Sequence, residues 1–209
     1  MYPSRRKLLG LAAMMPAAGA LFPRGALAVT GAEASATARE TIRQRYFPDV
    51  VLRTQDNQKV RFYQDLVKDR VVTINFFFAK CDEICPIVTA NLVKVQKLLG
   101  SRVGREIFMN SITLKPEEDS PAVLKQFAKM HHARVGAGWK FLTGKPADIE
   151  LLRRSLGFTN PDPRLDQDVN QHFGNVRYGS EPRMLWAACP GMANASFIAE
   201  SISWVIRRD

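Results

Sequence analysis

Cysteine and histidine are scarce in this chain, each occurring three times among 209 residues. So few cysteines exclude a small scaffold held by several disulfides, and an odd number leaves one thiol outside any pairing. The sequence also lacks internal repeats, low-complexity tracts and any stretch of Lys and Arg interleaved with aromatic residues. A nucleic-acid-binding protein is therefore not favoured, although the formal net charge is +10. Hydrophobic residues make up 46% of the chain, which is enough to form one sizeable core.

No apolar run is long enough to span a membrane, but the amino terminus has the features of an export signal. Two adjacent arginines, Arg5 and Arg6, precede a modestly apolar stretch that Pro16 interrupts. Ala26-Leu27-Ala28 then offers small residues at the two positions that a signal peptidase reads. We expect a twin-arginine-type signal peptide over residues 1–28, with an ordinary secretory leader or an uncleaved membrane anchor as alternatives. All three place the domain outside the cytoplasm, in the periplasm.

The remaining chain is predicted to form a linker followed by one domain. Residues 29–45 are small and polar and predict a flexible linker, and residues 46–209 are predicted to be the domain. The patterns predict these elements in chain order: a hairpin over 50–63, a strand over 71–78, a helix over 84–99, a strand over 106–114, a helix from 121, a strand over 139–142, a helix over 146–156, a loop over 158–170, a hairpin over 173–178 and 184–188, and a helix over 195–207. This alternation indicates an α/β layered domain with a mixed sheet.

Two cysteines, Cys81 and Cys85, lie where the buried strand over residues 71–78 gives way to a helix. Backbone N–H groups and the helix dipole favour an anion there, so we expect a lowered thiol pKa. The four-residue spacing predicts that both sulfurs lie on one helical face, one turn apart. Such a pair can close a reversible disulfide, or both thiolates can bind a soft ion such as Cu(I). An inert structural disulfide is the alternative.

Two sulfurs leave a soft metal ion short of ligands, and His172 is the best candidate for a third one. It follows the predicted loop over residues 158–170 and precedes the first strand of the late hairpin, which should flank the active end of the sheet. The alternative is a strand or surface histidine without a metal role. The leftover thiol, Cys189, could resolve a mixed disulfide with the pair, although a buried spare cysteine fits better.

Several motifs together resemble the SCO/SenC family over residues 46–208. They are Cys-x3-Cys-Pro after a strand of phenylalanines, SITLKPEEDSP over residues 111–121, FLTG over residues 141–144, and the late His172. The resemblance implies a thioredoxin-like mixed sheet flanked by helices, here with an N-terminal β-hairpin extension. It also implies one copper ion, Cu(I) or Cu(II), per monomer, with Cys81, Cys85 and His172 as ligands. The chain departs from the family pattern between the two cysteines, at Lys115 and at Gln171, which is typical of a divergent branch.

The predicted function is that of a periplasmic copper-binding, thiol-active chaperone that assists copper-site assembly in a respiratory oxidase. Its expected partners are a copper-receiving oxidase subunit or another periplasmic copper protein, a thiol–disulfide partner and the membrane surface. Two alternatives are a metal-free thiol–disulfide oxidoreductase, which does not need His172, and a copper or redox sensor without turnover. A peroxidase is disfavoured because Phe78 stands three residues before Cys81, where Thr or Ser is wanted.

Overall fold

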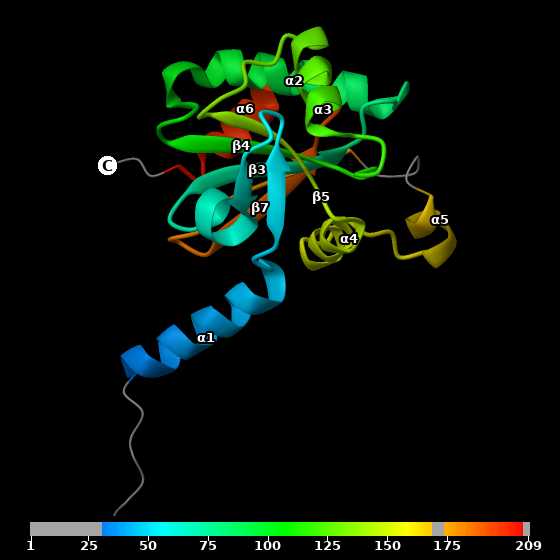
Figure 1. The fold of residues 1–209 in the computed structure, drawn as a ribbon. Helices are drawn as coiled ribbons and strands as arrows, with labels where there is room; N and C mark the ends of the chain where they lie inside the picture. Colours follow the sequence, from blue (N-terminus) through cyan, green and yellow to red (C-terminus); the bar gives the residue numbers. More distant parts are fainter. Residues whose placement is uncertain (1–30, 169–173, 207–209) are drawn as a thin grey trace, which may run out of the picture.

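The centre of the protein is a mixed sheet of seven strands, seen in a computed structural model that describes residues 31–168 and 174–206 (Figure 1). The strand order is β2-β1-β5-β4-β3-β6-β7. The three middle strands are parallel, and they are β3 (Val71–Phe77), β4 (Ile107–Thr113) and β5 (Trp139–Gly144). The outer strands pair antiparallel, and they are β1 (Val51–Thr54), β2 (Lys59–Arg61), β6 (Asn175–Ser180) and β7 (Leu185–Pro190). The predicted α/β class is confirmed.

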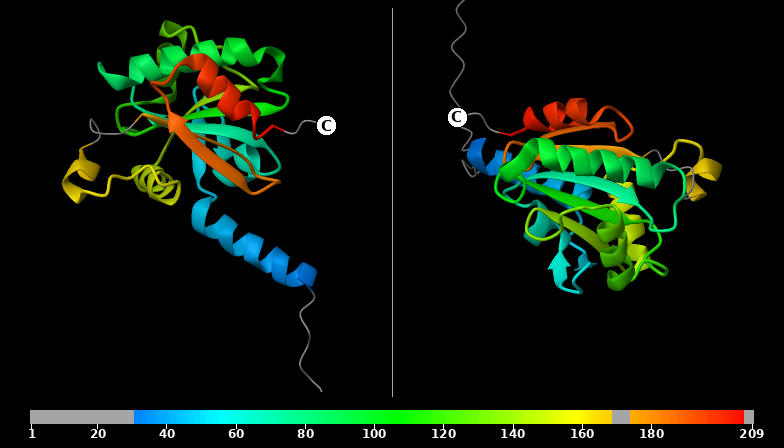
Figure 2. Two further views of the ribbon diagram at one scale, coloured as in Figure 1. Left: turned by 180° about the vertical axis from the view of Figure 1, so that it is seen from behind. Right: turned by 90° about the horizontal axis from the view of Figure 1, so that it is seen from above.

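Helices cover both faces of the sheet (Figure 2). One face carries α2 (Ile84–Leu99), α3 (Pro121–Met130) and α6 (Ala195–Ser203). The other face carries the π-helical turn η1 (Phe62–Val67) and α4 (Pro146–Ser155). The remaining helical segments are α1 (Gly31–Tyr46), the short 3-10 turn η2 (Gly100–Arg102) and α5 (Pro163–Gln167).

Strand β3 shows why the domain has a core on each face of the sheet. Its residues alternate in direction, so that Val72, Ile74 and Phe76 pack towards η1 and α4. Phe77 points to the other face, where its ring centre lies 4.9 Å from that of Phe127 in α3. Every residue of β3 after Val71 is buried. The continuous apolar run predicted this burial, because a strand with helices on both sides has no solvent face.

The segment predicted as a flexible linker is instead a helix over residues 31–46, and it extends away from the sheet (Figure 1). Arg39 donates to the buried carboxylate of Glu181 at 2.9 Å. Directly after the helix, the Phe47 ring packs against Trp186 with the ring centres 4.7 Å apart. The segment has no continuous apolar face, which hid a helix built from good helix formers such as Ala, Glu, Gln and Arg. The division into signal peptide, linker and domain stays a prediction.

Two other predicted boundaries differ from the structure. The predicted loop after residue 158 contains α5, whose five residues are too few to show an apolar period. Its cap is local, since the Asp162 side chain accepts from the Arg164 N–H at 2.9 Å. The last helix, predicted to reach residue 207, ends at Ser203 and is followed by a turn. In the part of the chain that the structure describes, no helix is long and apolar enough to cross a membrane.

Candidate thiol and metal site

Cys81 and Cys85 lie at the carboxyl end of β3, where the chain enters α2. Only Cys85 belongs to the helix, because α2 begins at Ile84. Pro86 explains this start: it has no N–H to donate, and its ring clashes with the carbonyl four residues earlier in a helix interior. Proline therefore fits only in the first turn, which leaves Cys81 outside. The expectation that both cysteines share one helical turn is wrong for Cys81.

The two cysteines are nevertheless in direct contact. The Cys85 N–H donates to the Sγ of Cys81 over 3.4 Å. The sulfur thus satisfies one of the open N–H groups of the helix start, at a point where Glu83 makes no side-chain cap. Cys81 is partly exposed, whereas Cys85 is buried with 1% of its surface accessible. No disulfide joins the three cysteines, all of which are among the described residues.

The surroundings of Cys85 disfavour its thiolate. Burial raises the pKa of the Cys85 thiol far above its ordinary value, and the hydrogen bond with Cys81 adds to the rise. The predicted lowering of the thiol pKa is therefore wrong for Cys85, because the loss of hydration outweighs the helix dipole. Near neutral pH this residue is a thiol, and a metal ion binding to its sulfur must displace the proton.

The loop that carries Cys81 is fixed by the buried carboxylate of Asp119, which the sequence analysis does not assign to the site. Asp119 Oδ2 accepts from the Ala79 N–H at 3.0 Å and from the Thr113 hydroxyl at 2.5 Å. Asp119 follows β4, so this carboxylate joins the segments after two neighbouring parallel strands. The available signal was topological: the carboxyl ends of adjacent parallel strands meet at one edge of the sheet, where polar side chains gather.

A second layer of contacts joins the same two segments at the surface. Lys80 forms an ion pair with Glu118, with the nitrogen 2.9 Å from the oxygen. The Lys115 ammonium lies 4.2 Å from the centre of the Phe78 ring. Lys115 is one of the positions at which the chain departs from the family pattern, and here it covers Phe78, the residue directly after the strand. The thiol loop therefore rests on the segment after β4 at three points.

The late hairpin approaches α2 next to the buried thiol. Gly174 has a φ of +48°, and a Cβ built on it would lie 2.7 Å from Cδ1 of Ile84. Only glycine accepts both this backbone conformation and this closeness. The Gly191 N–H donates to the Gly174 carbonyl at 2.9 Å, which holds the chain in place. His172 lies outside the described residues, and Gly174, two residues later, is packed against the neighbour of Cys85.

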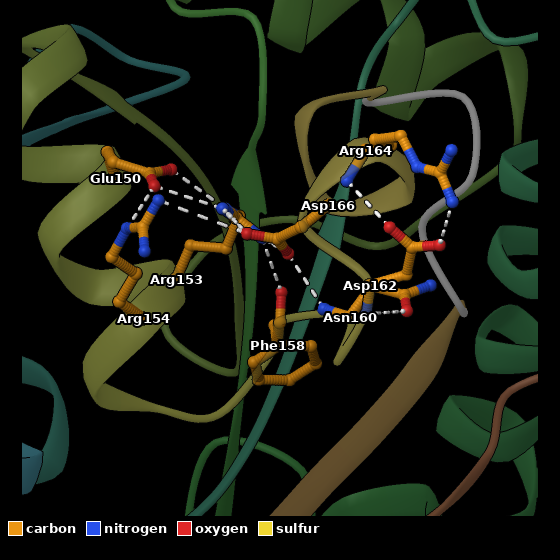
Figure 3. A network of polar contacts seen from close by, with 8 residues as sticks. All are labelled: Glu150, Arg153, Arg154, Phe158, Asn160, Asp162, Arg164 and Asp166. Carbon is orange, nitrogen blue, oxygen red and sulfur yellow. Dashed lines mark hydrogen bonds and ion pairs between the residues drawn. The ribbon is translucent and has the colours of Figure 1, made fainter.

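The chain before residue 169 is anchored as well, by the ion-pair network of Figure 3. Arg153 of α4 donates to both carboxylate oxygens of Asp166 in α5, at 2.6 and 2.9 Å, and it also binds Glu150. Asp166 accepts a further bond from the Asn160 N–H at 2.7 Å. The guanidinium of Arg153 holds the pKa of the Asp166 carboxyl well below its ordinary value. Elements on both sides of residues 169–173 are thus fixed to the body of the domain.

The third thiol, Cys189, is buried in β7, opposite Val176 of β6. Burial raises the pKa of this thiol to about 11. A protonated thiol in the core fits the expectation of a spare cysteine better than that of a reactive one. Within residues 31–168 and 174–206, no group of three or more His, Cys, Asp or Glu side chains could hold a metal ion.

Fold and site together define a thioredoxin-like α/β protein with a thiol pair at the end of a central strand. The model of the SCO1/SenC family matches residues 42–206, and the chain belongs to this family. The resemblance to SCO/SenC and the predicted thioredoxin-like fold are both confirmed.

Three similar proteins illustrate the relationship. A SCO1 protein homolog from Bacillus subtilis is 33% identical over 120 residues, which are 56% of this chain and 60% of that protein. The matched part therefore spans less than two thirds of that relative. A solved structure of BsSco, a member of the Sco family of cytochrome c oxidase assembly proteins in which a disulfide switch has been identified, is 25% identical. The match covers 75% of this chain and 90% of BsSco with a TM-score of 0.59. Bradyrhizobium japonicum ScoI with copper bound is 18% identical, covering 75% of this chain and 96% of ScoI with a TM-score of 0.59.

Proposed function

We propose that this chain is an exported, periplasmic copper-binding, thiol-active chaperone that assists copper-site assembly in a respiratory oxidase. Cys81, Cys85 and His172 would hold one copper ion as cargo. The observation that carries the proposal is the contacting thiol pair, in which the Cys85 N–H binds the Sγ of Cys81 at the sheet edge. Membership of the SCO1/SenC family supports it, as does the copper-bound state of the related ScoI. The signal peptide predicted over residues 1–28 is the basis for the proposed periplasmic location.

The donor chemistry suits a soft ion. Cu(I) readily accepts two sulfurs and an imidazole as ligands. Ions that prefer oxygen ligands, such as Mg²⁺, do not. Cys85 lies within the apolar core while Cys81 is partly exposed, so a bound ion would be shielded on one side and open to a partner on the other. Since Cys85 must lose its proton, the apparent copper affinity should rise with pH.

Metal binding by the full chain tests this site. The reduced protein is loaded with Cu(I) without oxygen, or with Cu(II), and the copper content is measured after desalting. Affinity is measured by competition with a coloured chelator. We expect about one copper per monomer, and C81S, C85S and H172A should each weaken binding by more than about 100-fold.

Two matched variants serve as controls, since they remove a cysteine and a histidine outside the proposed site. C189S and H132A should bind copper as the unchanged protein does. Wild-type affinity in H172A would overturn the three-ligand site, and equal losses in the controls would show that the variants act through folding.

A metal-free thiol–disulfide oxidoreductase is the second candidate, favoured by the unequal exposure of the two thiols. The Cys81 thiolate would attack a disulfide of the client, form a mixed disulfide and release one client thiolate. Cys85 would pass its proton to that thiolate and attack the sulfur of Cys81. This closes the Cys81–Cys85 disulfide and releases the second client thiolate, so two electrons have reduced the client.

Reduction of a peptide disulfide separates the two candidates. In the second candidate, C85S accumulates the mixed disulfide and H172A reduces the peptide at the wild-type rate. Copper binding that depends on His172, without reduction of the peptide, would reject the oxidoreductase.

A further inference from the structure

A basic pocket lies at the end of the sheet opposite to the thiol loop. Arg70 directly precedes β3, whereas Cys81 follows that strand, so the two are separated by the strand length of roughly 20 Å. The pocket has a volume of about 530 Å³. Three arginines from three different turns line it, namely Arg70, Arg105 and Arg183.

These arginines are available for an anionic ligand. Across the described ranges none of the three forms a hydrogen bond or an ion pair with a carboxylate. The Arg70 guanidinium lies 4.5 Å from the centre of the Phe108 ring, which fixes its plane while its N–H edges stay open to a ligand. Two acidic residues also line the pocket. One of them, Glu106, is already bound by Arg102 at 3.0 Å, which leaves only Asp69 to oppose the three positive charges.

Large apolar side chains are exposed on the neighbouring surface. Leu185, two residues after Arg183, is 41% exposed, and it lines a groove of about 480 Å³ between β7 and α6. Phe197 and Trp204 of the α6 side are 53% and 74% exposed along the same groove. Isolated exposed hydrophobic residues are common. A groove that carries two exposed aromatic rings, and whose Leu185 follows an arginine of the unpaired cluster by two residues, indicates an interaction surface.

Two contacts place the end of α6, the pocket and helix α1 at one pole of the domain. Arg102 donates to the Ser203 hydroxyl at 3.2 Å, which joins the end of α6 to the turn that carries Arg105. On the other side, Arg39 of α1 donates to Glu181 and to the Pro182 carbonyl, both in the turn between β6 and β7. The helix that follows the apolar leader in sequence is therefore attached to the turn that also carries Arg183.

We propose that this pole docks on an anionic phospholipid surface. Arg70, Arg105 and Arg183 bind headgroup phosphates, because a guanidinium presents paired N–H groups that match phosphate oxygens. The rings of Phe197 and Trp204 enter the headgroup layer, where aromatic side chains are favoured. A lipid accounts for both halves of the surface, whereas a small soluble anion would leave the aromatic half without a function. Docked in this way, the domain holds its thiol loop away from the bilayer.

Vesicle binding by the full chain tests the proposal. The protein is mixed with vesicles of phosphatidylcholine alone or with one quarter phosphatidylglycerol, and binding is expressed as the ratio between the two. Each variant is compared with the unchanged chain, because both carry the same basic leader and differ only at the substituted positions. The ratio for the pocket variant R70Q/R105Q/R183Q should be at least about tenfold lower than that for the unchanged chain. The matched variant R53Q/R134Q/R164Q removes the same charge from exposed arginines elsewhere and should change the ratio less than about threefold.

Each further outcome decides a part of the proposal. An equal fall of the binding ratio in both triple variants would overturn the role of the pocket, since binding would then follow net charge alone. W204A should weaken binding to the mixed vesicles several-fold, and wild-type binding would overturn the role of the aromatic half. Release of the protein by millimolar inorganic phosphate at matched ionic strength would assign the pocket to a free anion and overturn the lipid.

Folding and copper binding are measured in parallel. The pocket variant should keep its thermal transition and its copper affinity, which separates this proposal from that of the metal site. If the triple variant does not fold, R183Q in the exposed turn carries the test, and it should lower the ratio while a single R164Q should not.

Discussion

Replacement of Asp119 by alanine should loosen the thiol loop and destabilise the domain. The variant removes the acceptor of two hydrogen bonds, from the Ala79 N–H and the Thr113 hydroxyl. A hydrogen bond to a charged group contributes about 1.5–3 kcal/mol, and a buried donor left without a partner costs about 1–3 kcal/mol. Thr113 is fully buried, whereas Ala79 is half-buried and can regain a water molecule. We therefore expect the free energy of unfolding to fall by about 3–4 kcal/mol.

Two variants bracket this expectation. D119N keeps an oxygen acceptor and loses only the charge, so the fall should be about 1–2 kcal/mol. The charge of Asp119 also contributes to the raised pKa of Cys85, after burial and the Cys81 hydrogen bond, so alkylation of this thiol in D119N should begin at a lower pH. E118A changes the adjacent, exposed carboxylate and breaks only the ion pair with Lys80, so stability should stay close to wild type.

The assay is urea unfolding of the reduced protein at pH 7, followed by circular dichroism, together with the Cu(I) competition measurement. The copper affinity of D119A should drop about tenfold, because the loop that carries Cys81 loses its fixed position. A D119A protein with the stability and copper affinity of E118A would refute the reasoning, since the buried carboxylate would then hold neither the loop nor the site.

Three further predictions concern the elements around the site. C189A should lose less stability than wild type between pH 8 and 10 in urea titrations. Burial raises the pKa of the folded thiol from 9.0 to about 11, so its contribution is nearly complete at pH 8, and roughly 1 kcal/mol of it is lost by pH 10. G174A should lower the melting temperature and weaken copper binding, because the new Cβ would clash with Ile84. G100A has a similar φ of +58° with open space around its Cβ position and should keep its copper affinity, so equal copper losses would contradict the close-packing argument. D166N should melt several degrees lower than wild type at pH 6. Because the folded Asp166 carboxyl has a depressed pKa, this difference in melting temperature should narrow as the pH falls below 4. A difference that stays constant with pH would show that the ion pair is not the cause of the lower melting temperature.

Much of the fold could be predicted because its signals are local. The apolar run of β3 and the apolar period of α2 each identify a core element without reference to the rest of the chain. The junction between them placed Cys81 and Cys85 at one edge of the sheet, as the structure shows. His172 was identified through its distance in sequence and the family resemblance, and its role stays a prediction.

The features that could not be predicted depend on residues far apart in the sequence. In the sequence, Asp119 has only the features of a residue at a helix start. Its hydrogen bond with the Ala79 N–H becomes evident only from the pairing of β4 with β3. The pKa of Cys85 depends on how deeply the helix start is buried, and periodicity does not give this depth. Helix α1 has no apolar face to detect, and its main polar anchor, Glu181, lies far along the chain.

Two buried carboxylates, at opposite ends of the same sheet, each hold a neighbouring segment to the domain through hydrogen bonds. Asp119 ties the thiol loop to the segment after β4. Glu181 connects α1 to the domain by accepting hydrogen bonds from Arg39 at 2.9 Å and from the Tyr63 hydroxyl at 3.1 Å. Burial raises the pKa of the Glu181 carboxyl, but the hydrogen bonds that it accepts outweigh burial, so that its pKa is lowered. The strands between them form one continuous hydrogen-bonded sheet, and each carboxylate fixes a different end of it. Loss of Glu181 should therefore change how the domain sits on a membrane and leave copper affinity intact, whereas loss of Asp119 should do the reverse.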